Sequence, residues 1–506
     1  QLVKSLEKSE KRNFKLYAKR NSASEDLKVV QLFDALDKMN DYNEKELLKK
    51  TKSVKKQQLS NIKANLYKQI LSSLRLIRDE ANIDIHLHEQ MDHARILYNK
   101  GLYLQSLKML ERLKETAKAH QQLTFLQQAL FFEKKIESLY ITRSIQNKAD
   151  LLTTESDTVT NQILLVNQLS NLSLQLYSWY IKNGHARNNK DIAELKNFFE
   201  KNLPVHATKA TGFYEKLYLY QSYVWYAFIR QDFLQYYRYS QKWVDAFTTY
   251  PELLKTETAS YIKGVHNLMT AQFSLLSQDK LAKSIKQFES FTKQKFLQDN
   301  ENNRILAYQY LYTARINLYF LQGNFTKGLR LVPFLEEMLK EYSLYLDTHR
   351  VLVFYYKIAC LYFGSGNNEK AIDYLNRIIN QKGDLRTDLQ CYSRLLHLIA
   401  HYELGNFDLL EYLIKSVYRY MAKMENLSKV EEEMFAFLRR SFHVGAKALK
   451  PEFEKLVTKL KKYEGNALES RAFVYLDVIS WLKSKINGVD VQDVIKEKYS
   501  EGKKRK

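Results

Sequence analysis

The chain has 506 residues, of which 45% are hydrophobic and 13% aromatic, and its 79 Lys and Arg exceed its 57 Asp and Glu to give a formal net charge of +22. The apolar content excludes wholesale disorder, and only 4 Pro and 14 Gly favour nearly all-α structure, because long helices tolerate neither residue well. The positive charge favours association with nucleic acid, the ribosome or another anionic surface, although a generally lysine-rich proteome explains it as well.

The N-terminal segment and the cysteines indicate a cytoplasmic protein. The first 20 residues contain no apolar core of signal-peptide length, and no stretch approaches 18 uninterrupted apolar residues. Cys360 and Cys391 are too few for a disulfide framework, and no Cys-x-x-Cys pair points to zinc. We therefore expect no membrane span, no metal and no other cofactor.

Residues 1–80 are predicted to form a small basic helical unit. Helical patterns appear near 2–20, 27–39 and 57–78, and the segment holds 19 basic and 11 acidic residues. Cations interleaved with Phe14 and Tyr17 are typical of a surface that pins phosphates and stacks on bases. The alternatives are a capping repeat for the unit as a whole and a core stripe for the two rings.

The candidate nucleic-acid contacts are basic residues of the first helix, of the lysine-rich link at 47–58 and of the C-terminal end. They are Arg12, Lys15, Lys19, Arg20, Lys49, Lys50, Lys52, Lys55, Lys56, Lys503, Lys504 and Arg505. Two further stretches, 235–242 and 418–423, also mix basic and aromatic residues.

One pattern recurs at 312–337, 355–379 and 395–418: an apolar helical stretch, a Gly-Asn turn and a second apolar helical stretch. Gly and Asn accept the left-handed conformation that ends many helices. Inter-helix turns are therefore predicted at Gly101, Gly184, Gly323, Gly366 and Gly405, with degenerate copies near 231 and 278. From 184 onward these turns lie about 39 to 47 residues apart, a period that predicts a superhelical solenoid of stacked antiparallel helix pairs.

The predicted solenoid covers 81–424, and further helical repeats or a cap follow at 425–490. A polar stretch at 152–161 is predicted as a loop, and 491–506 as a basic tail. No run of strictly alternating residues closed by a tight-turn signal predicts a strand.

The segment 96–113, ILYNKGLYLQSLKMLERL, resembles the second half of a tetratricopeptide repeat. The resemblance rests on Gly101 at the turn, Tyr103 shortly after it and Ser106 as the small residue of the following helix. The period here is longer than the family's repeat of about 34 residues, and the Trp and Pro positions of the family are largely absent. The opening KSLEKSEKRNFK is similar to that of uncharacterised cytoplasmic proteins from Bacteroidota, which implies no activity.

The tetratricopeptide resemblance implies an inner groove that receives a helix or an extended peptide. Aromatic positions from the first helix of each pair, such as Tyr312, Tyr355 and Tyr356, are expected to face that groove.

Few residues have the spacing of a catalytic or metal site. His86, Glu89 and His93 fall at i, i+3 and i+7 and could share a helix face and bind a metal, but such residues on an exposed helix are more often solvated. His397 and His401 have the i, i+4 spacing of a helical zinc pair without the adjacent Glu of that motif, and packing histidines are the alternative. No Gly-rich phosphate loop or nucleophile-elbow motif is present. We therefore expect a protein that is not an enzyme and has no catalytic residues.

Three functions remain open from the sequence. The first is a non-enzymatic scaffold that docks on RNA or the ribosome, for which the charge and the basic N-terminal unit are the support. The second is an adaptor that holds a protein or peptide in the solenoid groove. The third is a transcription regulator with residues 1–80 as a DNA-binding unit, although no helix-turn-helix turn is visible there.

Overall fold

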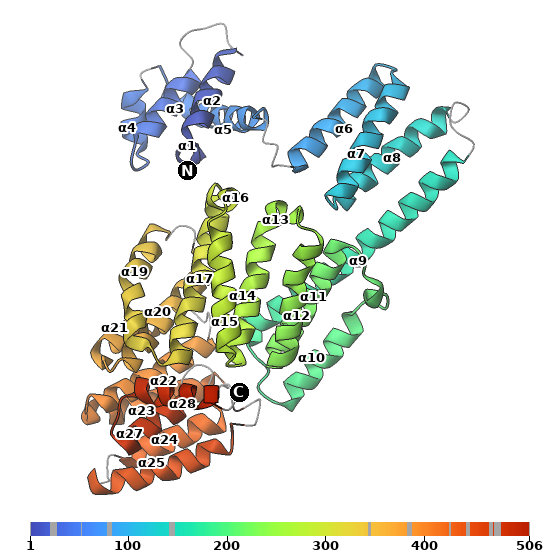
Figure 1. The fold of residues 1–506 in the computed structure, drawn as a ribbon. Coiled ribbons are helices and arrows are strands. Elements are labelled where there is room, and N and C mark those ends of the chain that lie inside the picture. Colours follow the sequence, from blue (N-terminus) through green and yellow to red (C-terminus); the bar gives the residue numbers. More distant parts are fainter. Residues whose placement is uncertain are drawn as a thin grey trace. The chain divides into compact units, whose positions relative to one another are not determined.

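The computed structural model describes residues 2–20, 28–51, 53–77, 83–140, 147–342, 346–381, 387–424, 427–441, 446–464, 469 and 477–504. All regular secondary structure in these ranges is helical, and none of them contains a strand (Figure 1). The all-α prediction is therefore confirmed. The chain divides into two compact units, Gln1–Thr116 (unit 1) and Ala117–Lys506 (unit 2), and each is described by itself. The sequence placed the end of the N-terminal unit at residue 80.

Unit 1 is a small helical bundle followed by a helical hairpin. Its helices are α1 (Leu2–Ser5), α2 (Lys8–Arg20), α3 (Lys28–Lys38), α4 (Glu44–Lys50), the 3-10 turn η1 (Lys56–Gln58), α5 (Leu59–Arg75), α6 (Ile83–Asn99) and most of α7 (Tyr103–Ala119). Phe14 and Phe33 meet in the bundle core with ring centroids 4.7 Å apart. In the hairpin, Gly101 is left-handed at φ +76° and the buried Ser106 hydroxyl donates to the Ala94 carbonyl at 2.8 Å.

Unit 2 holds the other helices of the described ranges. The longer ones are α8 (Leu123–Tyr140), α9 (Lys148–Asn183), α10 (Asn189–Asn202), α11 (Phe213–Ile229), α12 (Phe233–Thr249), α14 (Thr258–Ser274), α15 (Gln278–Thr292), α17 (Glu301–Gln322), α19 (Val332–Glu341), α20 (Thr348–Gly364), α21 (Asn368–Ile379), α22 (Thr387–Glu403), α23 (Phe407–Lys423), α24 (Lys429–Ser441), α25 (Ala446–Lys461), α27 (Val478–Asn487) and α28 (Val491–Lys504). Short turns lie between them: η3 (Ala207–Lys209), α13 (Leu253–Thr256), α16 (Lys295–Gln298), α18 (Phe325–Gly328) and η4 (Leu329–Leu331).

Helices of unit 2 pack mainly on their neighbours in the sequence. Helix α11 packs on α9 and α12, α12 packs on α14, and α14 packs on α15 and α17. The same holds for α20, α21, α22 and α23 in turn. Figure 1 shows α11 to α17 side by side in chain order. Apolar faces are thus covered by the preceding and following helices.

Left-handed residues separate many of these helices. Gly323, Gly366 and Gly405 have φ between +65° and +85°, and each lies between two helices that pack together or succeed one another. Gln231 and Leu276 adopt φ +59° and +53° at the two turns where the sequence has no Gly. Gly184, Gln121 and Gly488 also have positive φ, and the last two were not anticipated.

The predicted loop at 152–161 is wrong, because these residues lie inside the 36-residue helix α9. Leu152, Ser156 and Val159 are buried at i, i+4 and i+7, which gives this polar stretch a packed face against α8. The hydroxyls of Thr153 and Thr158 donate to carbonyls four residues earlier at 2.8 Å, so they need no loop conformation.

The segment expected as a basic tail forms helix α28 over Val491–Lys504, which packs on α27 and returns to α17. Val494 and Ile495 are buried there, and the burial of these two apolar side chains holds the helix against the unit. The preceding helix α27 is held by Glu403 of α22, whose carboxylate accepts from the Trp481 indole at 2.7 Å and from the Lys485 ammonium.

The contact between Gly364 of α20 and Phe325 predicts a packing-sensitive position. A Cβ at Gly364 would lie 2.2 Å from the Phe325 ring, so Gly364→Ala should lower the free energy of unfolding by about 1–3 kcal/mol. Urea denaturation measures this change. Gly366→Asn is the control, because nothing lies within 4 Å of a Cβ there and Asn tolerates its φ of +85°. A Gly364→Ala protein as stable as the wild type would contradict the close packing.

Candidate functional site

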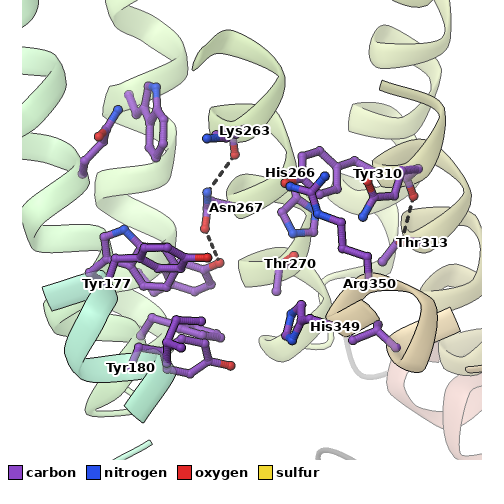
Figure 2. Close-up of a pocket in the computed structure, with 18 of the residues that line it drawn as sticks. Tyr177, Tyr180, Lys263, His266, Asn267, Thr270, Tyr310, Thr313, His349 and Arg350 are labelled. Carbon is purple, nitrogen blue, oxygen red and sulfur yellow. Dashed lines mark hydrogen bonds between the residues drawn. The ribbon is translucent and has the colours of Figure 1, made fainter. Parts of the chain in front are cut away.

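Unit 2 contains a cavity of about 800 Å³, open to solvent on one side, among α9, α11, α12, α14, α17 and α20. Figure 2 shows Tyr177 and Tyr180 on one side of it and His266, Tyr310 and Arg350 on the opposite side. Cavities of roughly 300–1,000 Å³ are the size at which proteins bind small ligands. The two sides differ in chemistry, which decides what the cavity can hold.

The first side is an aromatic wall. The Tyr177 ring lies 4.8 Å from the Trp225 ring, and Tyr180 lies 5.6 Å from Trp225 and 5.2 Å from Phe228, centroid to centroid. Tyr177 remains 43% exposed, so part of its ring is open to a ligand. A planar ligand can stack on such a surface.

The opposite side carries Lys263, Arg350 and Lys357, which we call the cation triad. Arg350 has its Nε 3.2 Å from an Asp347 carboxylate oxygen, and the Lys357 ammonium donates to the Asn317 side-chain carbonyl. Within the part of the chain that the structure describes, neither lysine has a carboxylate partner, and the terminal nitrogens of Arg350 have no acceptor. The cation triad is therefore poised for an anion.

Burial and the neighbouring positive charges lower the pKa values of titratable groups on this side of the cavity. Burial, followed by the charges of Lys357 and Arg350, lowers the pKa of His266 to about 3. Burial lowers the pKa of Lys357 to about 8. Burial and the charge of Arg350 also lower the pKa of Lys263, although Lys263 is an exposed residue. An incoming anion would relieve this repulsion.

His266 is held as a neutral ring in a fixed orientation. It stacks on Tyr310 with centroids 3.8 Å apart and planes at 10°. On the next residue of α14, the Asn267 amide nitrogen donates to the Lys263 carbonyl at 2.7 Å and its side-chain oxygen accepts from the Tyr236 hydroxyl at 2.8 Å. These contacts fix the wall before any ligand arrives.

Several buried polar atoms around the cavity have no hydrogen-bond partner within the described ranges. They are the side-chain amide nitrogen of Gln231, the indole nitrogen of Trp243 and the side-chain carbonyl oxygen of Gln309. Their residues are 7%, 3% and 5% exposed and all three line the cavity. Buried polar groups are normally paired, so these three atoms are exceptions among the residues that line the cavity.

Helical spacing places these groups together. Arg350 and Lys357 are seven residues apart on α20, and Tyr310 and Asn317 have the same spacing on α17, so each pair shares a face. The Asp347 side chain caps α20 by accepting from the Arg350 amide at 2.8 Å. Sequence reasoning missed the site. The available signal was Lys357 inside the otherwise apolar run VLVFYYKIACLYF, because an unpaired cation in such a run is costly.

None of the predicted nucleic-acid contacts lines this cavity. In unit 1, Lys15 pairs with Asp34 at 2.6 Å and Lys50 with Glu46 at 2.7 Å. Exposed positions are taken by Arg12, Lys19, Arg20, Lys49, Lys55 and Lys56. In unit 2, the backbone of Lys503 and Lys504 lies in α28. Lys52 and Arg505 lie outside the described residues.

Phe14 belongs to the core of unit 1 and is fully buried, so it cannot stack on a base. The stretch 235–242 contacts itself and α11: Tyr239 stacks on Tyr223 at 4.2 Å, and the Lys242 ammonium lies 5.1 Å from the Tyr239 centroid. In the stretch 418–423, Tyr420 is covered by the Arg394 guanidinium at 3.9 Å. These rings are largely occupied by the protein's own cations.

The three tyrosines that were expected to face one groove do not lie together. Tyr356 lines the cavity, but Tyr312 and Tyr355 lie under Arg315 and Arg377 at 5.1 and 5.3 Å. Neighbouring residues on a helix point about 100° apart, so Tyr355 and Tyr356 do not share a face.

The histidine groups are placed as follows. His86, Glu89 and His93 are exposed on α6. His397 and His401 are buried with their Nε2 atoms 3.3 Å apart, and burial followed by the charges of His401 and Arg394 lowers the pKa of His397 to about 4. No group of three or more His, Cys, Asp or Glu within the described ranges is arranged to hold a metal ion.

His266 predicts a pH dependence of stability. Its folded-state pKa lies below the unfolded value, so the unfolded state binds an extra proton as the pH falls from about 6.5 towards 3. Stability should therefore decrease over this range, by up to about 1.4 kcal/mol per pH unit for this group. Urea denaturation at pH 8 and at pH 5 should show a smaller loss for His266→Gln than for the wild type. Equal losses would contradict an imidazole that stays neutral in the folded protein.

Within the described ranges, no helix combines the length and apolar character needed to cross a bilayer. Neither a family model, nor a curated protein, nor a solved structure matches the chain.

Proposed function

We propose that the chain is a non-enzymatic, tetratricopeptide-like α-solenoid that docks on RNA, alone or within the ribosome, and receives an unpaired nucleotide in the cavity of unit 2. The single observation that carries this proposal is the pairing of an aromatic wall with the cation triad in one cavity. Bases stack on aromatic rings while cations hold the backbone, which is how single-stranded nucleic acid is generally bound.

The solenoid part of the proposal is supported by the order of packing. Consecutive helices cover each other from α11 to α23, and left-handed turns at Gly323, Gly366 and Gly405 recur between them. Stacked helix pairs build an extended surface on which a long ligand can lie.

The charge supports the choice of an anionic partner. The chain carries +22 overall, and the lysines at 49, 55 and 56 of unit 1 are exposed. Exposed lysines of unit 1 and the cations of the cavity in unit 2 can each contact phosphates. Such a protein acts in the cytoplasm.

A protein-binding adaptor is the second candidate, because an apolar strip borders the cavity. Leu174, Tyr177 and Ile181 lie at i, i+3 and i+7 on α9 and are 66%, 43% and 41% exposed. Such a strip suits the apolar face of a partner segment. Nuclease treatment before affinity capture separates the candidates: partners that survive digestion and are lost in Leu174→Asp would favour the adaptor. Nothing in the described ranges specifically favours the transcription-regulator alternative.

Removal of one stacking surface tests the RNA proposal. Tyr177→Ser should weaken binding of a single-stranded RNA oligonucleotide by about 5- to 150-fold, the loss expected when one aromatic platform is removed. Fluorescence anisotropy measures the affinity. Tyr412→Ser is the matched control, because Tyr412 is 69% exposed on α23 and does not line the cavity. Equal affinities for the two variants would count against the cavity as the RNA site.

Salt provides an independent test. Released counterions contribute to affinity, so the logarithm of the association constant should fall linearly with the logarithm of the salt concentration between about 50 and 300 mM. The Lys357→Met protein should show a shallower slope than the wild type because it makes one phosphate contact fewer. Affinity that stays constant over this range would exclude a phosphate-based mode of binding.

A further inference from the structure

Unit 1 contains a long stretch of chain in which every charged residue is basic. From Leu47 to Arg78 there are nine Lys and Arg and no Asp or Glu, and helix α5 lies within this stretch. Carboxylates from outside the stretch pair with Lys50 and Arg75 at 2.7 and 2.8 Å. Five further cations of the stretch have no carboxylate partner within the described ranges: Lys49, Lys55, Lys56, Lys63 and Lys68. This charge is complementary to that of an anionic partner.

Helix α5 presents part of this stretch as a fixed surface. Its inner side is held in the core of unit 1, where Leu66 and Ile70 are buried. Away from the core, Tyr67 and Leu71 are 58% and 44% exposed. We call this side the outer face of α5, and its residues are Ser60, Lys63, Ala64, Tyr67, Lys68 and Leu71. Because packing of the inner side fixes the helix, the outer face is ordered before any partner arrives.

Cations lie on both sides of Tyr67 on the outer face of α5. Successive helical residues are about 100° apart, so Lys63 falls on one side of Tyr67 and Lys68 on the other. The Lys63 ammonium donates to the hydroxyl of Tyr42, a second ring that is 58% exposed, and lies 4.5 Å from its centroid. Glu44 accepts from the same hydroxyl at 3.4 Å and balances part of this charge. Lys68 has no ion pair within the described ranges, so positive charge remains next to Tyr67.

The Tyr67 ring is available for stacking. Other tyrosines in basic stretches are covered by cations of the protein itself, as Tyr420 is by Arg394. Tyr67 has no ring contact, covering cation or hydrogen bond in the part of the chain that the structure describes. The bases of a duplex already stack on one another, whereas an unpaired base can stack on an aromatic side chain. The outer face of α5 therefore suits a single strand.

We propose that the outer face of α5 binds single-stranded RNA, with an unpaired base on Tyr67 and neighbouring phosphates on Lys63 and Lys68. This inference rests on the proposed RNA function and adds to it a second contact, in unit 1. The charge of the stretch supports an anionic occupant, and the exposed ring favours a single strand. A membrane surface fits less well, because α5 exposes one large aliphatic side chain, Leu71, whereas membrane-surface helices bury a broad apolar face.

The test measures binding of the full chain to a single-stranded RNA oligonucleotide and to the duplex of the same sequence, by fluorescence anisotropy. Tyr67→Ser should weaken binding of the single strand by about 5- to 150-fold and leave binding of the duplex unchanged. Tyr412→Ser is the matched control, because Tyr412 is 69% exposed on α23 in unit 2. Thermal unfolding of each variant shows whether it is folded.

A second variant tests the phosphate contact. Lys68→Gln should reduce the slope of the logarithm of the association constant against the logarithm of the salt concentration by about one. Lys190→Gln is its control, because it removes the same charge from an 83% exposed side chain on α10 and should leave the slope unchanged. Both lysines are exposed, so neither substitution disturbs a core. Equal slopes for the two variants would overturn the contact at Lys68.

The outcomes separate this inference from the proposed function. If Tyr67→Ser binds RNA as the wild type does while Tyr177→Ser binds it more weakly, the inference is overturned and the cavity stands as the RNA site. If only Tyr67→Ser is weakened, the inference is supported and the cavity is overturned as the RNA site. Equal weakening of single strand and duplex would overturn stacking on Tyr67. A wild-type chain that binds phosphatidylserine vesicles and no RNA would overturn both proposals.

Discussion

The structure of unit 2 depends on one constraint: a helix that is apolar along its side must be covered, and here the cover comes chiefly from the helices next to it in the chain. Contacts are close where the pairs meet. Gly364 of α20 leaves room for the Phe325 ring, and Trp481 of α27 reaches Glu403 of α22. The helices from α9 to α20 do not fill all the space among them, and the cavity lies there.

The cations of the chain fall into two groups that composition alone does not distinguish. Many lie over tyrosine rings or beside carboxylates, as Arg394 does over Tyr420 and Lys15 does beside Asp34. These contacts reduce the cost of a dense positive charge and stabilise helix surfaces. The cation triad is different, because two of its members have no carboxylate partner within the described ranges, and the charges of Lys357 and Arg350 add to burial in lowering the pKa of His266. Lys357 in particular is shielded from solvent, so it favours an anionic ligand more than an exposed lysine does, since water screens its charge less.

Sequence patterns predicted the helices and many of the turns, because these features depend on interactions between residues close together in the chain. The shortage of Gly and Pro indicated helices, and the Gly at positions 323, 366 and 405 marked left-handed turns, because both effects act through one or two residues. Two predictions were wrong at segments whose conformation depends on packing against other helices. The polar stretch at 152–161 is helical because Leu152 and Val159 pack inward, and the segment from 491 docks as α28 because Val494 and Ile495 are buried.

The amino-acid sequence by itself determined that the chain is helical, strongly basic and punctuated by recurrent turns, since propensity, charge and turn geometry are properties of short segments. Only the tertiary structure decided which side chains meet. Tyr177, His266 and Arg350 are separated by more than 80 residues along the chain at each step and share one cavity because α9, α14 and α20 surround it. Their proximity depends on how all the helices of the unit pack together, and this packing cannot be read from any short segment of the sequence.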